Sequence, residues 1–437
     1  MYVDKIGVKL TFLLLLLIFL PSCANYKLNI SKNITDPIPK LPDTLALTHT
    51  LYLVGNAGNA KNNKNEQTMR LVQKHLSKAP EKSSIVFLGD NVPARGFPGK
   101  GSSQRPRAER ALDAQLKTLK EFKGKAFMVP GFNDWKKGRA GIDRIEKYVQ
   151  DYPGIDIRWE PDDGCSGPDD EDDLTDDLVI VFIDSQWWMM DWKSEPELNL
   201  GCEITSKETF LYFFEEALKK NRHKNVVIVM HHPLYSNGHR GGKYTLREHF
   251  FPFKDLPYLP LPGVGSLISF FRAKVGTRQD LSHPEARVLQ EKLTDIADKY
   301  GHFIFAAGHE NNLQYIEREG QSFIISGAAS GETSPAHTGE GAQFAYGGAQ
   351  GFSLLRFYED GSVWIDFKVL DDDHPDGRLV FRKKIKGPLP ALEEEAPPTF
   401  PEYEAGLDTI VKELDPNTAD SEVHRFFFGD HYRDAYT

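Results

Sequence analysis

Five apolar stretches of the chain end in short polar turns, and the same arrangement recurs from residue 51 to residue 313. The clearest is Ser84–Leu88, a largely apolar run that stops at Gly89 and Asp90. Such a run predicts a buried strand that presents a carboxylate at its carboxyl end, where open α/β sheets bind ligands. The other four stretches are Leu51–Asn59, Ala126–Trp135, Val226–Tyr235 and Ile304–Leu313.

The segments between these stretches carry apolar residues at helical spacing. Helices are predicted over Glu66–Leu76, over Arg105–Lys120 and in the segment that begins at His283 and Pro284. Three later apolar runs predict further strands that complete a second sheet. These runs are Ser322–Ile325, Phe352–Phe357 and Val363–Val369.

Composition narrows the class of protein. The chain has 437 residues and is 40% hydrophobic, as expected for a globular protein. Its net charge of -10 argues against a nucleic-acid partner, because nucleic acid requires a basic surface. Small anionic substrates are still compatible with this charge, since a bound metal ion reverses its sign locally.

The first residues resemble a targeting segment. Lys5 and Lys9 precede an apolar core, Leu10–Leu20, which is too short to cross a bilayer with ease. The core runs into the letters LPSC, ending at Cys23, which resemble the lipobox of a bacterial lipoprotein. An ordinary signal peptide is the alternative interpretation.

We therefore predict a lipoprotein signal peptide over residues 1–22, lipidation at Cys23 and a flexible tether over residues 23–46. The lipid would hold the protein to a membrane through its buried CH₂ groups. No acidic cluster follows Cys23, which favours the periplasmic face of the outer membrane in the bacterial envelope.

Two further cysteines, Cys165 and Cys202, flank an acidic run over Asp169–Asp177. In an oxidising envelope compartment they most simply form one disulfide, and two free buried thiols are the alternative. The acidic residues lack the ligand spacing of a calcium loop, so we predict a solvated surface excursion.

Taken together, the five turns resemble those of the calcineurin-like metallophosphoesterase family, in its purple-acid-phosphatase-like branch. That family has Asp-x-His or Asp-x-Gly, then Gly-Asp, then Gly-Asn-His-Asp/Glu, then His, then Gly-His-x-His. The order and spacing match from Leu51 to Val369. The resemblance implies an α/β fold in which two β-sheets form a sandwich flanked by helices, with the phosphoesterase domain over residues 47–385.

Within the turns, four positions depart from the family pattern. Asn56 replaces an aspartate and Asn311 a histidine, both ligands of the first metal in the family. Phe132 replaces an asparagine that binds the second metal, and a phenyl ring cannot coordinate. Asn133 replaces the histidine that protonates the leaving group, and an amide has no titratable proton for general acid catalysis.

Three family ligands are kept, namely Asp90, His231 and His309. The resemblance implies that they hold a single divalent ion, Zn, Fe or Mn, while the second metal is lost. His232 and His239 are candidates for a substitute acid.

The C-terminal part, residues 386–437, begins as a Pro- and Glu-rich linker and ends in an aromatic tail around Phe426–Phe428. This tail resembles the junction between a phosphoesterase domain and an outer-membrane β-barrel in longer relatives. It predicts such a barrel as a partner. The segment Phe250–Pro262, rich in proline and aromatics, is predicted to form a rigid insertion near the site.

Three functions are open at this point. The leading prediction is an envelope lipoprotein with a degenerate metal site that serves in binding or as a scaffold. The alternative is a phosphoester hydrolase that works with one metal. In the third, the retained residues hold no metal and are only hydrogen-bonded.

Overall fold

The structure is a computed structural model that describes residues 25–59, 63–253 and 259–389. These residues belong to one unit of the chain, Met1–Leu389, and a second unit, Pro390–Thr437, lies outside them. The predictions of a signal peptide, of lipidation at Cys23 and of an aromatic tail also lie outside the described residues.

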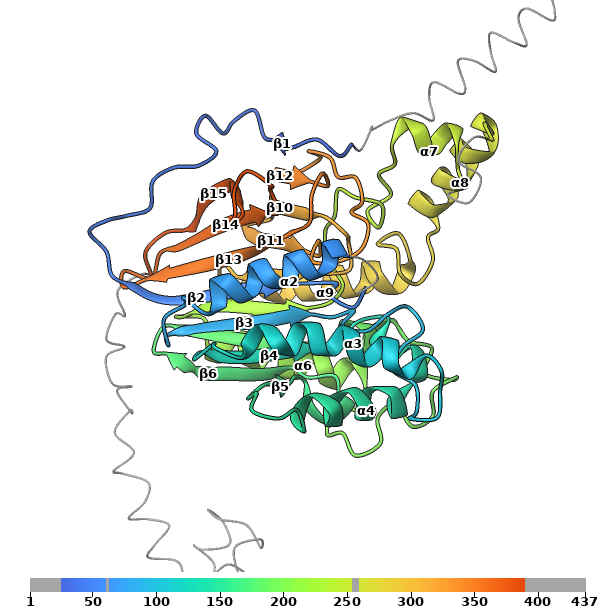
Figure 1. The fold of residues 1–437 in the computed structure, drawn as a ribbon, viewed down its shortest axis with the longest axis horizontal. Helices are drawn as coiled ribbons and strands as arrows, with labels where there is room; N and C mark the ends of the chain where they lie inside the picture. Colours follow the sequence, from blue (N-terminus) through green and yellow to red (C-terminus); the bar gives the residue numbers. More distant parts are fainter. Residues whose placement is uncertain (1–24, 60–62, 254–258, 390–437) are drawn as a thin grey trace, which may run out of the picture. The chain divides into compact units, whose positions relative to one another are not determined.

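Two β-sheets form the centre of the described unit, as the sequence predicted (Figure 1). One has the strand order β15-β14-β13-β2-β3-β4-β5, and the other has the order β1-β12-β10-β11-β9-β8-β7-β6. Strands β2, β3 and β4 run parallel, as do β7, β8, β9 and β11, so their carboxyl ends meet at one edge. The strands of the first sheet are β2 (Leu47–Val54), β3 (Ser83–Leu88), β4 (Lys125–Val129), β5 (Arg158–Trp159), β13 (Gly351–Tyr358), β14 (Val363–Val369) and β15 (Arg378–Lys386). Those of the second are β1 (Asn29–Ile30), β6 (Asp169–Thr175), β7 (Leu178–Phe182), β8 (Asn225–Met230), β9 (Ile304–Ala307), β10 (Leu313–Arg318), β11 (Gln321–Ser326) and β12 (Ala342–Tyr346).

The central strands are apolar on both faces because each face is covered. In β3, Val86 and Leu88 point into the core between the two sheets, and Ile85 and Phe87 point into the core beneath the helices. Successive side chains of a strand point to opposite faces, so an unbroken apolar run is what a doubly covered strand requires.

Helices cover the outer faces of both sheets. The apolar faces of α2, α3 and α4 pack on the first sheet, and those of α6 and α9 pack on the second. The helices are α2 (Asn63–Leu76), α3 (Arg105–Leu116), α4 (Arg139–Gln150), α5 (Ser185–Met189), α6 (Lys207–Lys220), α7 (Leu246–Phe250), α8 (Pro262–Lys274) and α9 (Pro284–Tyr300). Short 3-10 turns are η1 (Lys117–Leu119), η2 (Asp134–Lys137) and η3 (Asp162–Gly164).

The prediction of a flexible tether is wrong for residues 25–46. Strand β1 pairs with β12, and Asn25 forms an isolated bridge with Ala336. Ile30 and Ile34 pack against the core between the sheets. The polar composition of this segment gave no sign of a strand. Its pairing partner, β12, lies about three hundred residues later in the chain.

The acidic run also differs from the prediction. Residues Asp169–Thr175 form β6, an edge strand antiparallel to β7, in place of a loop. Glu171 in this strand is buried and pairs with Lys125 and Arg158. The disulfide prediction is confirmed, because Cys165 and Cys202 are bonded with their Cα atoms 5.6 Å apart.

The segment predicted as a rigid insertion contributes to two helices. Helix α7 ends at Phe250, and α8 begins at Pro262. Figure 1 shows both helices to one side of the sheets. In the part of the chain that the structure describes, no helix is both long and apolar enough to cross a membrane.

Candidate metal centre

The polar turns that follow β2, β3, β4, β8 and β9 come together at the carboxyl edge of the sheets. Glycines make this approach possible. A Cβ at Gly89 would lie 2.5 Å from Nδ1 of His231, and one at Gly131 would lie 2.2 Å from the backbone nitrogen of Asp90. Any larger residue at either position would push two turns apart.

Three residues in these turns have an unusual backbone. Asn56, Asp90 and His309 have φ values of 59°, 53° and 62°, in the left-handed region that non-glycine residues rarely occupy. Such conformations cost free energy and persist where the surrounding structure imposes them, often at functional sites. All three are positions where the resemblance placed a metal ligand.

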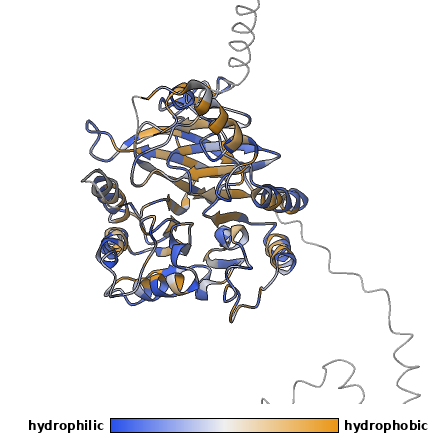
Figure 2. Cartoon of the chain, turned by 90° about the vertical axis from the view of Figure 1, so that its right-hand side faces the viewer, coloured by the Kyte–Doolittle hydropathy of each residue, from blue (hydrophilic) through white to orange (hydrophobic). Residues whose placement is uncertain are grey.

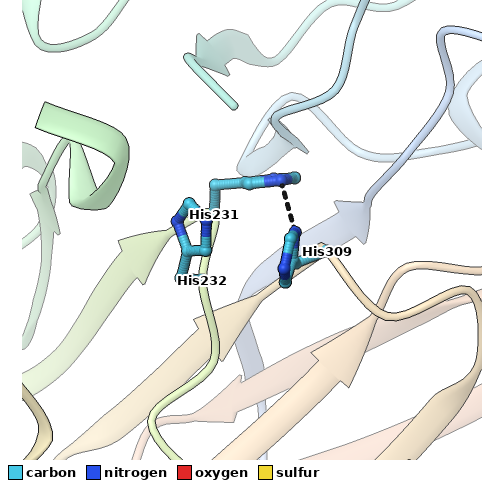
Figure 3. A group of neighbouring side chains, drawn as sticks. All are labelled: His231, His232 and His309. Atoms are coloured by element: carbon cyan, nitrogen blue, oxygen red, sulfur yellow. Dashed lines mark hydrogen bonds between the residues drawn. The ribbon is translucent and has the colours of Figure 1, made fainter. Parts of the chain in front are cut away.

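His231 and His309 face each other across the site (Figure 3). Nδ1 of His231 lies 2.8 Å from the carbonyl oxygen of Leu88, and Nε2 of His309 lies 2.8 Å from that of Gln279. A carbonyl only accepts, so these nitrogens carry the protons and the other nitrogen of each ring has a free lone pair. The two free nitrogens are 3.2 Å apart.

That arrangement fits a metal ion. Two nitrogens bound to one tetrahedral zinc, each at about 2.0–2.1 Å, lie roughly 3.4 Å apart. Histidine ligands characteristically donate their second ring N–H to a carbonyl or carboxylate, as His231 and His309 do. Without a cation between them, the two lone pairs would face each other directly.

The third ligand can come from two directions. Oδ1 of Asp90, the predicted ligand, lies 3.4 Å from Nε2 of His231. His232 also joins the group, since ligand atoms of His231, His232 and His309 lie within 4.8 Å of one another. However, both ring nitrogens of His232 are already bonded, to Oγ of Ser185 at 3.0 Å and to Oε1 of Gln279 at 2.8 Å. Asp90 is therefore the more available ligand.

Burial sets the charge of these groups in the metal-free protein. It lowers the pKa of His231 to about 4 and that of His232 to about 3, and it lowers the pKa of His309 well below its usual range. Burial also raises the pKa of Asp90 to about 6, although the backbone N–H of Asn133, 2.6 Å from Oδ1, opposes this. The imidazoles are thus neutral at pH 7 and ready to coordinate.

A pair of amides occupies the position that the resemblance assigns to the first metal. Oδ1 of Asn56 accepts the backbone N–H of His309 at 2.8 Å, which fixes the orientation of the amide. Its Nδ2 then donates to Oδ1 of Asn311, also at 2.8 Å. The two substituted residues therefore satisfy each other, and their oxygens are engaged by N–H donors.

The turn that follows β4 also departs from the family pattern. The ring of Phe132, at the position of the missing ligand, lies 3.5 Å from Nζ of Lys136 in a cation–π contact. Asp134 is fully buried and accepts the backbone N–H groups of Gly131 and Val92 at 2.8 and 3.1 Å. It therefore joins two turns, although there is no histidine for it to orient.

The proposed substitute acids are engaged by other side chains. His232 is neutral at pH 7 and donates its proton to a buried amide, so it is a poor general acid. His239 places Nε2 2.7 Å from Oε1 of Glu248 and stacks on Tyr244.

Sequence reasoning missed residues that support the site from outside the five turns. Gln279 receives hydrogen bonds from two histidines, one through its backbone carbonyl and one through its side chain. Asn91, next to a predicted ligand, joins β4 to Asp134. The polar character of Asn91 within the second turn was a usable signal, whereas nothing local distinguishes Gln279.

Comparisons with known proteins bear on the fold. No family model and no curated protein matches the sequence. The structure is similar to a solved structure of GAP50, described as the anchor in the inner membrane complex of Plasmodium, with a TM-score of 0.50 and 15% sequence identity. The alignment covers 78% of this chain and 89% of that chain, and at this identity the similarity concerns the fold alone.

Proposed function

We propose that this chain is a lipid-anchored envelope member of the calcineurin-like metallophosphoesterase family that holds one divalent metal ion and acts as a binding or scaffold component. The observation that carries the proposal is the hydrogen bond between Asn56 and Asn311. It occupies the first metal position with a neutral, self-satisfied pair. The family's chemistry relies on two metals to generate hydroxide and to clamp the phosphoryl group.

The remaining ion would be Zn, Fe or Mn, held by His231, His309 and Asp90. When bound, it would supply Lewis acidity and an anchoring point for an anionic group. The chain's own residues orient the two rings through backbone carbonyls and exclude water, since His231 is fully buried. At the position of the family's acid they place Asn133, whose amide cannot protonate a leaving oxygen.

The proposed setting is the periplasmic face of the bacterial outer membrane, with the lipid on Cys23 and an outer-membrane β-barrel as partner. Lipidation rests on the lipobox-like letters at the N-terminus, and the barrel rests on the aromatic tail. The similarity to GAP50, described as an anchor, is in keeping with a scaffold role.

The test is elemental analysis of the purified full-length chain, together with its rate of phosphoester hydrolysis. We expect about one metal per chain, lost in Asp90→Asn or His231→Ala, and hydrolysis no faster than in those variants. Two metals per chain, with hydrolysis that Asp90→Asn abolishes, would overturn the proposal. Circular dichroism of each variant establishes that the fold is retained.

A further inference from the structure

Helix α8 has its large apolar residues on the outside. Its buried positions are Gly265, Ser266 and Ser269, all small. The side chains of Leu267 and Phe271 are 56% and 55% exposed. Water-facing helices normally show the opposite distribution, with the apolar face turned toward the core. The exposed apolar residues of this helix are Val264, Leu267, Ile268, Phe270 and Phe271.

Close packing on α7 explains the small residues. A Cβ at Gly265 would lie 2.2 Å from the backbone carbonyl oxygen of His249, so only glycine allows the two helices to approach this far. Because the small residues take the inner face, the large ones are left outside. The sequence thus builds an apolar face that the described part of the chain does not cover.

The exposed face continues beyond α8. Further large apolar residues are exposed in α7, in the described parts of the connection between the two helices and directly after α8. Figure 2 views the molecule from this side and shows apolar, orange segments on the helix pair at the top. A patch of this kind marks an interaction surface. The additional residues are Leu246, Phe250, Phe253, Leu259 and Val275.

The beginning of the described chain lies beside this helix pair. Asn25 forms a bridge with Ala336, and Ala336 forms a second one with Gly238 in the loop that leads to α7. That loop reaches the helices, because a Cβ at Gly242 would lie 2.9 Å from Ala273 of α8.

Cys23 precedes Asn25 by two residues, and two residues span no more than about 8 Å. A lipid on Cys23 would therefore enter the bilayer close to α7 and α8. This argument rests on the lipid anchor in the proposed function. The position of Asn25 thus indicates which surface the apolar face meets.

We propose that α8 lies in the interface of the membrane that carries the lipid of Cys23, with its apolar face among the acyl chains. The helix has 13 residues, too few to cross a bilayer but enough to lie along its surface. Its last turn carries Lys274, which is exposed and suits anionic headgroups. A single lipid attaches a protein without orienting it, and α8 supplies the second contact.

This orientation would bring the metal centre to the membrane side. Three residues after the end of α8, the turn that begins at Thr277 contains Gln279, whose carbonyl binds His309. Asp280 in the same turn is paired with Arg272 of α8 at 2.9 Å. The helix that contacts the lipid is therefore directly connected to the support of the histidine pair.

The experiment uses the full-length protein with its native N-terminus, reconstituted in vesicles of phosphatidylethanolamine and phosphatidylglycerol. A polarity-sensitive fluorophore is attached at Leu267→Cys, and quenching by acyl-chain spin labels is compared with that at Tyr212→Cys on α6. Tyr212 is 61% exposed and serves as the matched control. The native Cys165 and Cys202 are paired and do not react with the label.

We expect at least several-fold stronger quenching at position 267 than at position 212, and loss of this difference when Phe271→Asp and Ile268→Asp are added. An unquenched label at 267 in an acylated chain would overturn the proposal for α8 while leaving the anchor intact. Shielding of the fluorophore from water that increases with protein concentration and does not depend on the spin-labelled lipid would also overturn the proposal. It would favour a second copy of the chain on this face. Quenching in a chain whose Cys23 is found unacylated by mass spectrometry would support α8 and refute the lipid anchor.

Discussion

The five polar turns form a site with two halves, which differ in whether their polar atoms are paired without a metal ion. On one side, two asparagine amides bind each other, because an amide carries both a donor and an acceptor. On the other side, the nitrogens of His231 and His309 that face each other are both acceptors, because backbone carbonyls take the protons of the other two. The first half therefore has its polar atoms paired without a metal, whereas the second places two lone pairs together where a metal ion could bind. The difference teaches that side chains in neighbouring turns form a self-sufficient pair only where each donor meets an acceptor.

The strongest way to break this comparison is to restore the family residues. In Asn56→Asp, Phe132→Asn, Asn133→His, Asn311→His, we expect metal content to rise from about one to about two per chain. Hydrolysis of a phosphodiester should then rise by roughly 10²–10⁴-fold, since the restored histidine supplies general acid catalysis. Elemental analysis and a chromogenic substrate give the readout. The same four changes with Asp90→Asn are the control, and equal rates in both would contradict the assignment.

Removal of a ligand tests the other half. In His309→Ala, we expect affinity for Zn²⁺ or Mn²⁺ to fall by more than about 100-fold, since even an outer hydrogen-bond partner of a ligand is worth 10–100-fold. Isothermal titration calorimetry measures the affinity. His49→Ala is the matched control, because His49 is equally buried but bonds to Ser84 outside the site. Equal affinity in the two variants would show that the pair does not bind the ion.

The amide pair should stabilise the fold in place of the first metal. Asn56→Gly keeps the backbone free to adopt its positive φ but removes both side-chain hydrogen bonds, so we expect a loss of about 2 kcal/mol in the free energy of unfolding. Asn56→Ala should cost about 1 kcal/mol more, because of the strain of a Cβ at this φ. Urea denaturation measures both. An unchanged stability in Asn56→Gly would mean that the pair contributes nothing.

His49, which is buried outside the site, tests what burial alone does to a histidine, for comparison with those in the site. Burial lowers the pKa of His49 to about 4, below its value of 6.5 in the unfolded chain. Between these values the unfolded chain binds a proton that the folded chain does not, so stability contributed at this position falls as pH falls from 6.5. The stability difference between the wild type and His49→Gln should therefore shrink by about 1.2 kcal/mol from pH 7 to pH 5.5. Denaturation at both pH values checks this, and a constant difference would contradict it.

Most of the fold could be predicted because its information is local. The run that forms β3, with Gly89 and Asp90 after it, carries its strand and its turn in consecutive residues. The helix predicted over Arg105–Lys120 appears as α3 and η1 for the same reason. By contrast, β1 depends on a partner more than three hundred residues away, and its two residues show no period of their own.

The candidate site shows the same division. The retained Asp90, His231 and His309 could be named from the turns, and the structure brings His231 close to both of the others. The bond between Asn56 and Asn311 could not, because it joins positions 255 residues apart. Helix α8 was not predicted from the sequence, and only its packing on α7 shows that its large apolar residues point outward.

The strained backbone at Asn56, Asp90 and His309 has a consequence for how substitutions act on this chain. The conformation of the three turns is imposed by glycine contacts and by the sheets, and it is shared by an amide, a carboxylate and an imidazole. The geometry of the turns is thus separable from the chemistry of the side chains that they present. Point substitutions at these positions can therefore change what the site binds without a change of fold.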